Sequence, residues 1–435
     1  MPPEPKKPAR TAWLYSVFPA SIAAGPLGTM VQLYLIQLNG QALGTIYGSL
    51  AAAIYNGVSI PAALFWGFAT DRLHKRKSLI ALSYALVAVA LVSYYFDRTT
   101  TGTISRYGVI SFVSVASATP LNLLIMETEP KGRWAGTFAR LSMMSSIGNA
   151  AGLLLSTIWT QAFPNSLVLL FVPMGAFSVV SSGLALATIR EPSFILERET
   201  VAMRKPSFVS RLRANPVFFL GIPTGSDFKR AFRGLRSSLT SYIPLFYIST
   251  ILFYLSAGLF NTSFVPAMHF FSMPDQTVFA VILAGVVVQT LTFQGAGRYV
   301  NTRSLVSSSI QGLLLRGWSY LAIGAAALIL SGPIFAVSAF IFYPLAGGIA
   351  FAIYYTSANT MMFNTVQGKR AGAALGVYSA VVGIASMGGS FVSGFISVYV
   401  GYDITFVAAG VLLFAGVGVL ARLPRKQSPQ EGALQ

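Results

Sequence analysis

Apolar stretches long enough to cross a bilayer recur along the whole of this 435-residue chain. A bilayer core of about 30 Å needs roughly 20 helical residues, so each stretch is long enough for one crossing. The predicted spans are 13–36, 42–66, 78–96, 106–127, 135–159, 166–189, 242–268, 277–296, 308–331, 333–361, 372–399 and 404–421. We therefore predict an all-α integral membrane protein with twelve transmembrane helices.

The basic residues set the orientation of these spans. Of 30 lysines and arginines, 26 lie in segments that share one side of the membrane if the spans alternate. The opposite segments hold Arg98 and Arg106, while Arg140 and Arg316 lie inside spans. Basic residues resist translocation, so we expect a multi-pass protein of the cell membrane with both termini in the cytoplasm. The formal charge of +18 then indicates attraction to anionic inner-leaflet lipids rather than to nucleic acid.

A charged, proline-containing segment from Arg190 to Ser241 divides the spans six and six. We predict a cytoplasmic tail at 1–12, a six-helix bundle at 13–190, a cytoplasmic central loop at 191–240, a second bundle at 241–422 and a tail at 423–435. Within the loop, apolar residues from Phe228 to Leu239 recur at helical spacing opposite four basic residues. This pattern predicts an amphipathic helix on the inner headgroup layer.

The two halves of the chain also resemble each other. The segment from Asn122 to Gly136 aligns with the segment from Asn359 to Gly372 if one residue is dropped. Both segments end one span and open the next. A duplication of six-helix units places a substrate path between the halves, where one half can rock against the other.

The turn after the second span carries the most specific motif, Gly67-Phe-Ala-Thr-Asp71-Arg72-Leu-His74-Lys75-Arg76-Lys77. It resembles the G-x-x-x-D-R-x-G-R-R/K signature of the major facilitator superfamily, with His74 in place of the second glycine. With the six-plus-six division and the long central loop, the resemblance covers residues 13–422. It implies two pseudo-symmetric six-helix bundles and a secondary transporter that works by alternating access.

The resemblance also implies an inner gate made of Gly67, Asp71, Arg72, Lys75, Arg76 and Glu127. A glycine lets a neighbouring helix approach closely, and a carboxylate can accept N–H groups at the N-terminus of another helix. In the family, that helix is the eleventh, and the basic residues of the motif reach an acid in the place of Glu127. The alternative is that these residues only anchor the topology.

Polar residues on the helices that line the path in this family are candidate substrate contacts. The candidates are Gln32, Asn122, Arg140, Tyr254, Asn261, Tyr354, Tyr355 and Asn359. Helix–helix hydrogen bonding explains the uncharged ones at least as well. Arg140 is on helix 5, which borders the cavity in the family, whereas Arg316 is on the peripheral helix 9. Either arginine could instead snorkel to the inner surface.

All 12 acidic residues lie at span ends or in loops. A carboxylate in mid-membrane would be the expected proton carrier or partner of a cationic drug. We therefore expect a small organic substrate that is anionic or neutral, with a coupling ion and the direction of transport left open.

Three other functions compete with a solute transporter. A multidrug/proton antiporter would suit Gly148-x-x-x-Gly152, but Leu153 stands where the antiporter signature has proline, and close packing also explains the glycines. A transport-inactive sensor on the same scaffold would need no gate that opens and closes, so the motif from Gly67 to Arg76 and Glu127 argue against it. A membrane enzyme would need an embedded cluster of histidines or acids. With 2 histidines, no cysteine and no nucleotide-binding loop, we expect no catalytic residues, no metal site and no cofactor. We also expect a monomer.

Overall fold

The computed structural model describes residues 11–73, 75–128, 134–164, 166–189, 243–329, 332–365 and 371–423. Within these ranges every regular element is a helix, as predicted. The predicted central loop with its amphipathic helix lies outside the described residues, as do His74 and most of both tails.

The first group of helices follows the predicted spans closely. It consists of η1 (Thr11–Ser16), α1 (Val17–Ala24), α2 (Leu27–Leu73), α3 (Arg76–Phe96), α4 (Thr100–Thr128), α5 (Trp134–Ala162) and α6 (Leu167–Thr188). The second group consists of α9 (Ile243–Phe270), α10 (Asp275–Asn301), α11 (Leu305–Leu328), α12 (Gly332–Tyr343), η4 (Pro344–Ala350), α13 (Phe351–Thr365), α14 (Ala371–Tyr399) and α15 (Tyr402–Leu420).

Two glycines shape the start of the first group. Gly40 has φ 76° inside α2, and this left-handed conformation turns the chain between the first and second predicted spans. Gly25 separates α1 from α2, and a Cβ there would lie 2.6 Å from the Asn149 carbonyl oxygen of α5. Both positions need the smallest residue, one for its backbone angle and one for close packing.

The glycine pair of α5 packs against α1. A Cβ at Gly148 would lie 2.6 Å from the Phe18 carbonyl oxygen, and one at Gly152 would overlap the Ile22 carbonyl oxygen. Small residues at this spacing let two membrane helices approach closely. The pair therefore has a packing role here, independent of any antiporter signature.

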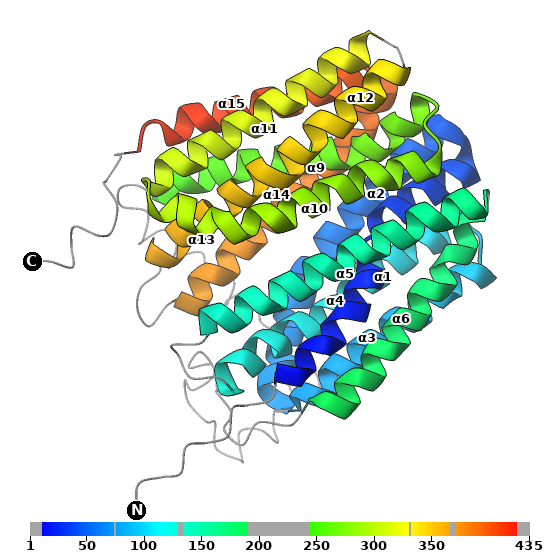
Figure 1. The fold of residues 1–435 in the computed structure, drawn as a ribbon, viewed down its shortest axis with the longest axis vertical. Helices are drawn as coiled ribbons and strands as arrows, with labels where there is room; N and C mark the ends of the chain where they lie inside the picture. Colours follow the sequence, from blue (N-terminus) through cyan, green and yellow to red (C-terminus); the bar gives the residue numbers. More distant parts are fainter. Residues whose placement is uncertain are drawn as a thin grey trace, which may run out of the picture.

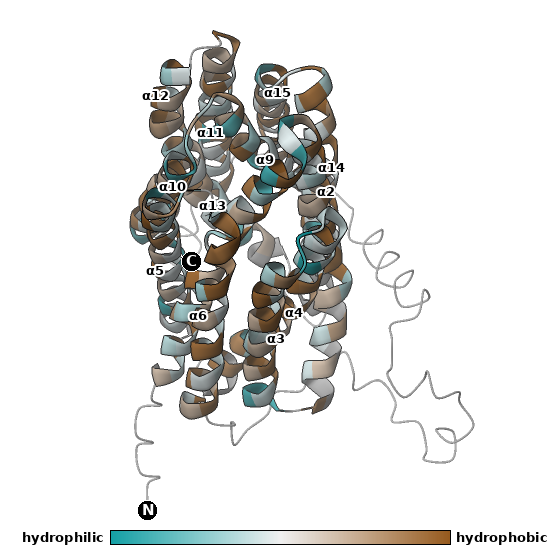
Figure 2. Cartoon of the chain, turned by 90° about the vertical axis from the view of Figure 1, so that its right-hand side faces the viewer, coloured by the Kyte–Doolittle hydropathy of each residue, from teal (hydrophilic) through white to brown (hydrophobic). Residues whose placement is uncertain are grey.

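Ten helical stretches of the described chain are long and apolar enough to cross a membrane. The first, Ala12–Gly67, contains the Gly40 turn and so covers two predicted spans. The ninth predicted span, α11, is not among the ten, and it carries Arg316 and a run of serines. The apolar colouring of the helices in Figure 2 agrees with a membrane environment, while the number twelve stays a prediction.

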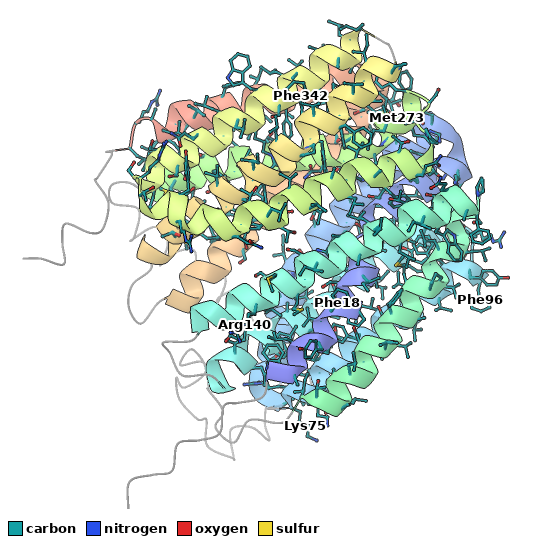
Figure 3. All side chains as sticks on the ribbon, viewed as in Figure 1. Phe18, Lys75, Phe96, Arg140, Met273 and Phe342 are labelled. Carbon is teal, nitrogen blue, oxygen red and sulfur yellow. The ribbon has the colours of Figure 1, made fainter. Side chains whose placement is uncertain are left out.

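The two groups lie side by side in Figure 1, with α3, α4 and α6 in the lower part and α11, α12 and α15 in the upper part. Between the groups, α2 packs against α14 and α9, and α5 packs against α10. Figure 3 shows Lys75 and Arg140 towards one end of the helices and Phe96 and Met273 towards the opposite end. Predicted inner and outer turns therefore lie at opposite ends of the fold.

The turn between α3 and α4 is fixed by an ion pair between Asp97 and Arg106. The backbone N–H of Thr99 also donates to Asp97 Oδ1 over 3.0 Å. Hydrogen bonds from Thr99, followed by the charge of Arg106, hold the pKa of the Asp97 carboxyl below its usual value.

Candidate substrate cavity and gates

A polar cluster joins the two groups of helices at the predicted outer ends; we call Gln41, Thr45, His269 and Tyr402 the outer cluster. Gln41 Nε2 donates to the Pro266 carbonyl and to the Tyr402 hydroxyl, both over 2.8 Å. The Tyr402 hydroxyl is also 2.9 Å from Thr45 Oγ1. These bonds tie α2 to α9 and α15, so they hold the outer ends of the two groups together.

His269 completes the outer cluster. Its Nδ1 lies 2.8 Å from Gln41 Oε1. An amide oxygen only accepts hydrogen bonds, so Nδ1 carries the proton and donates. This bond joins His269 of α9 to a residue in the opposite half of the chain.

Below the outer cluster, α2 and α14 form a seam of small residues. A Cβ at Gly394 would overlap Ser49 Oγ, and one at Gly383 would lie 2.6 Å from Ile60 Cγ1. Near the middle of the seam, Asn56 Nδ2 donates to Ser390 Oγ over 3.3 Å. The seam therefore has no room for larger residues at these points.

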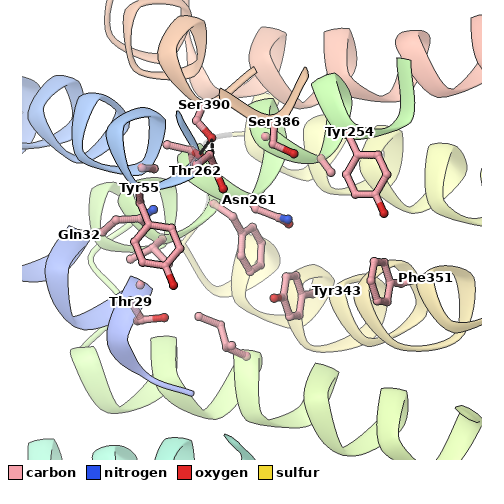
Figure 4. A pocket seen from close by; sticks show the side chains of 18 of the residues that line it. Thr29, Gln32, Tyr55, Tyr254, Asn261, Thr262, Tyr343, Phe351, Ser386 and Ser390 are labelled. Atoms are coloured by element: carbon pink, nitrogen blue, oxygen red, sulfur yellow. Dashed lines mark hydrogen bonds between the residues drawn. The ribbon is translucent and has the colours of Figure 1, made fainter. Parts of the chain in front are cut away.

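A cavity of about 440 Å³ lies between the two groups of helices (Figure 4). Residues of α2 and α4 line it from one group. Residues of α9, α10, α11, α12, α13 and α14 line it from the other. The described lining is Gly28, Thr29, Gln32, Ala52, Tyr55, Asn56, Tyr107, Phe253, Tyr254, Ala257, Gly258, Asn261, Thr262, Phe264, Val265, Ile282, Arg316, Tyr343, Phe351, Ser386 and Ser390. Aromatic rings and uncharged polar groups dominate this lining.

The π-helix η4 helps to shape one wall. Tyr343 precedes it and Phe351 follows it, and both line the cavity. A π-helix changes the angular position of the residues that follow it, and such segments are frequent at functional sites. Regular 3.6-residue periodicity does not predict that Tyr343 and Phe351 line the same cavity, so the sequence did not identify these two residues.

Arg316 reaches the cavity from α11, with a side chain that is 3% exposed. Its Nε donates to the Tyr320 hydroxyl over 2.7 Å. Its guanidinium carbon lies 4.9 Å from the ring centre of Phe253 and 5.5 Å from that of Phe351. Within the described ranges, Nη1 has no hydrogen-bond partner.

The predicted substrate contacts fall into two sets. Gln32, Tyr254 and Asn261 line the cavity, and Figure 4 shows Asn261 between Gln32 and Tyr254. Gln32 is 8% exposed, and its Oε1 has no partner among the described residues. Figure 4 also shows Thr29 and Tyr55, which sequence reasoning missed because isolated hydroxyls on apolar helices are common.

The remaining candidates are not among the described lining residues. Tyr354 is buried and stacks on the lining residue Phe253 with ring centres 3.9 Å apart. Tyr355 is exposed beside Phe293, Asn359 is half-buried on α13, and Asn122 is exposed on α4. Arg140 is exposed near the predicted inner end of α5. The arginine that lines the cavity is Arg316 instead, although it lies on the helix that was expected to be peripheral.

The predicted inner gate is described in part. Gly67 is buried on α2, Lys75 is exposed, and Arg76 is fully buried and donates from Nη1 to the Thr70 carbonyl. Asp71 and Arg72 lie in the last turn of α2, and Glu127 lies near the end of α4. The side chains of these three residues lie outside the description, so the gate stays a prediction.

Neither a known family profile nor a curated protein matches the sequence. Solved structures with this arrangement of helices do exist. A POT family transporter in complex with 5-aminolevulinic acid is 14% identical over 94% of both chains, with a TM-score of 0.69. A mutant of the nucleoside transporter NupG is 15% identical over 94% of this chain and 98% of its own, also with a TM-score of 0.69.

The human organic anion transporter MFSD10 is 14% identical over 96% of this chain and 99% of its own, with a TM-score of 0.60. At these identities the likeness concerns the fold. The chain has the fold of the major facilitator superfamily, as its motif indicated.

Proposed function

We propose that this protein is a secondary transporter that moves a small organic solute across the membrane by alternating access. The carrying observation is the cavity of about 440 Å³, whose lining comes from both groups of helices. A site between two bundles becomes accessible from either side when one bundle rocks against the other. The named functions of the similar folds, which include transport of nucleosides and organic anions, support this proposal.

The outer cluster indicates which state of the proposed transport cycle the structure represents. Its hydrogen bonds hold α2 against α9 and α15 above the cavity. In an alternating-access cycle these bonds belong to the state that is closed on the outer side, and they must break for outward opening. The predicted inner gate of Gly67 to Arg76 and Glu127 would act at the opposite end.

The charges around the cavity favour an anionic or neutral solute over a cationic drug. The carboxylate side chains that the structure describes are those of Asp97, Asp275 and Asp403, and none of them lines the cavity. Arg316 does. A lipophilic cation would meet a positive charge there with no described acid to offset it.

The test is solute flux into liposomes that contain the purified protein, with labelled carboxylic acids, sugars, amino acids, nucleosides and cationic dyes as probes. Ala52→Trp is the matched blocked variant, because Ala52 lines the cavity and an indole would fill part of it. We expect flux of at least one probe above that of protein-free liposomes, and loss of this flux in Ala52→Trp. Absence of flux for every probe, or flux unchanged by the indole, contradicts the proposal.

A further inference from the structure

We propose that Arg316 is the anion-binding group of the central cavity and that it holds the carboxylate of a small aromatic acid. The biological meaning of this site rests on the proposed transport function, while the site itself stands on the geometry around Arg316.

The first argument is the unbalanced charge of Arg316. Its side chain is 3% exposed, and its one described hydrogen bond goes to the neutral Tyr320 hydroxyl. A buried cation is costly unless it is paired and hydrogen-bonded. The rings of Phe253, Tyr320 and Phe351 lie 4.9 to 5.5 Å from its guanidinium carbon, and such rings attract a cation. Ring faces nevertheless give Nη1 no acceptor oxygen.

The second argument is an unpaired donor on a side chain that lines the cavity. Arg316 lines the cavity, and Nη1 has no partner within the described residues. A guanidinium presents its N–H groups as a planar fork that matches a carboxylate. The described carboxylates of Asp97, Asp275 and Asp403 belong to the turns and helix starts at the outer ends. An anion from the cavity would therefore supply the missing acceptors.

The third argument concerns the remainder of the ligand. Phe253, Tyr254, Tyr343 and Phe351 border the same cavity as Arg316. Aromatic rings prefer offset-stacked or edge-to-face contacts with other rings. A volume of about 440 Å³ falls in the usual range for small-molecule sites, roughly 300–1,000 Å³. A planar aromatic acid would satisfy the charge with its carboxylate and the walls with its ring.

The packing of α11 explains how a helix that was expected at the periphery brings the Arg316 guanidinium to the cavity. A Cβ at Gly312 would lie 2.9 Å from Tyr354 Cβ and 3.0 Å from the Ala350 carbonyl oxygen. Gly312 is one turn before Arg316, so α11 approaches η4 and α13 closely at that level. The long arginine side chain then spans the remaining distance to the cavity.

The experiment measures binding to the purified full-length protein with three probes of nearly the same shape: benzoate, benzamide and benzamidinium. Their charges are negative, neutral and positive, so the series isolates the effect of charge. For the wild type we expect benzoate to bind roughly tenfold or more tightly than benzamide, and benzamidinium to bind most weakly. This comparison needs no substitution.

Variants then assign the effect to one residue. Arg316→Gln should remove the preference for benzoate over benzamide, and Arg316→Lys should keep part of it, because lysine retains the charge without the fork. Arg140→Gln is the control, since it also removes a positive charge from a predicted span but at an exposed position. We expect the control to bind benzoate as the wild type does.

Three results would overturn the proposal: no benzoate binding by the wild type, no preference for benzoate over benzamide, or an unchanged preference in Arg316→Gln. Binding and flux are separate readouts. Benzoate binding through Arg316 without flux of any solute would refute the transport function and leave the anion site in place. Flux without a preference for benzoate would refute the anion site and leave the transport function in place.

Discussion

Gln41 makes more described hydrogen bonds between the two groups of helices than any other residue of the outer cluster. Its side chain bonds to the Pro266 carbonyl, the Tyr402 hydroxyl and His269 Nδ1, each over 2.8 Å. Gln41→Ala removes all three while leaving the helix backbone of α2 unchanged. We expect this substitution to shift the protein from the outer-closed towards the outer-open state.

The size of the shift follows from the number of bonds. After exchange with water, a hydrogen bond at such a partly exposed site contributes about 0.7 kcal/mol, within the usual net range of roughly 0.5–1.5 kcal/mol. Three bonds therefore give a shift of about 2 kcal/mol, which is roughly a 30-fold change in the ratio of the two states.

Labelling of a single cysteine in the cavity measures this ratio. The chain has no cysteine, so Ala52→Cys would carry the one reactive thiol. A membrane-impermeant maleimide added outside should label this thiol roughly 30-fold faster in Gln41→Ala, provided the outer-open state is the minor one. Asn39→Ala is the matched control, because Asn39 bonds to Leu35 and Thr100 within the first group of helices. Equal labelling rates in Gln41→Ala and Asn39→Ala would refute the assignment of the outer cluster as a gate.

Three further outcomes are expected. Gly394→Ala should also speed outside labelling, because its Cβ would overlap Ser49 across the seam, whereas Gly418→Ala, which has open space around it, should not. Asp71→Asn should strongly reduce solute flux while expression and melting temperature stay near wild type, and normal flux would refute the inner-gate prediction. The pKa of Asp97 is lowered in the folded protein, first by hydrogen bonds from Thr99, so its stabilisation exists above the unfolded pKa and is lost as pH falls through the folded pKa. The melting temperature of Asp97→Asn should therefore lie below that of the wild type near neutral pH and converge with it in acid; a gap that persists in acid would contradict this.

The sequence predicted the fold class well because each hydrophobic span and each basic loop can be recognised from its own short stretch of residues. Each described helix lies on a predicted span, and the turn at Gly40 falls within the short link expected between the first two spans. Three of the eight substrate candidates, Gln32, Tyr254 and Asn261, line the cavity.

The choice between Arg140 and Arg316 depended on information that one sequence does not carry. Both were recognised as cations inside spans, and the family topology favoured Arg140. In the structure, α11 packs closely against η4 and α13 at Gly312, and Arg316 lines the cavity. Such departures from regular helix geometry depend on contacts between distant segments, so span-by-span reading does not predict them.

The outer cluster was missed for a similar reason. Gln41 and Tyr402 are separated by 361 residues, and each alone is an ordinary polar residue at a helix end. Only the docking of α2 on α15 brings them together.

Two distances measured in liposomes test alternating access most directly. Spin labels at Leu43→Cys and Val400→Cys report the outer ends, and labels at Ser78→Cys and Thr302→Cys report the inner ends, all at exposed positions. Double electron–electron resonance on each pair, with and without Gln41→Ala, gives the change at each end. Alternating access predicts that Gln41→Ala lengthens the outer distance and shortens the inner distance. Distances that do not change, or that change in the same direction at both ends, would contradict it.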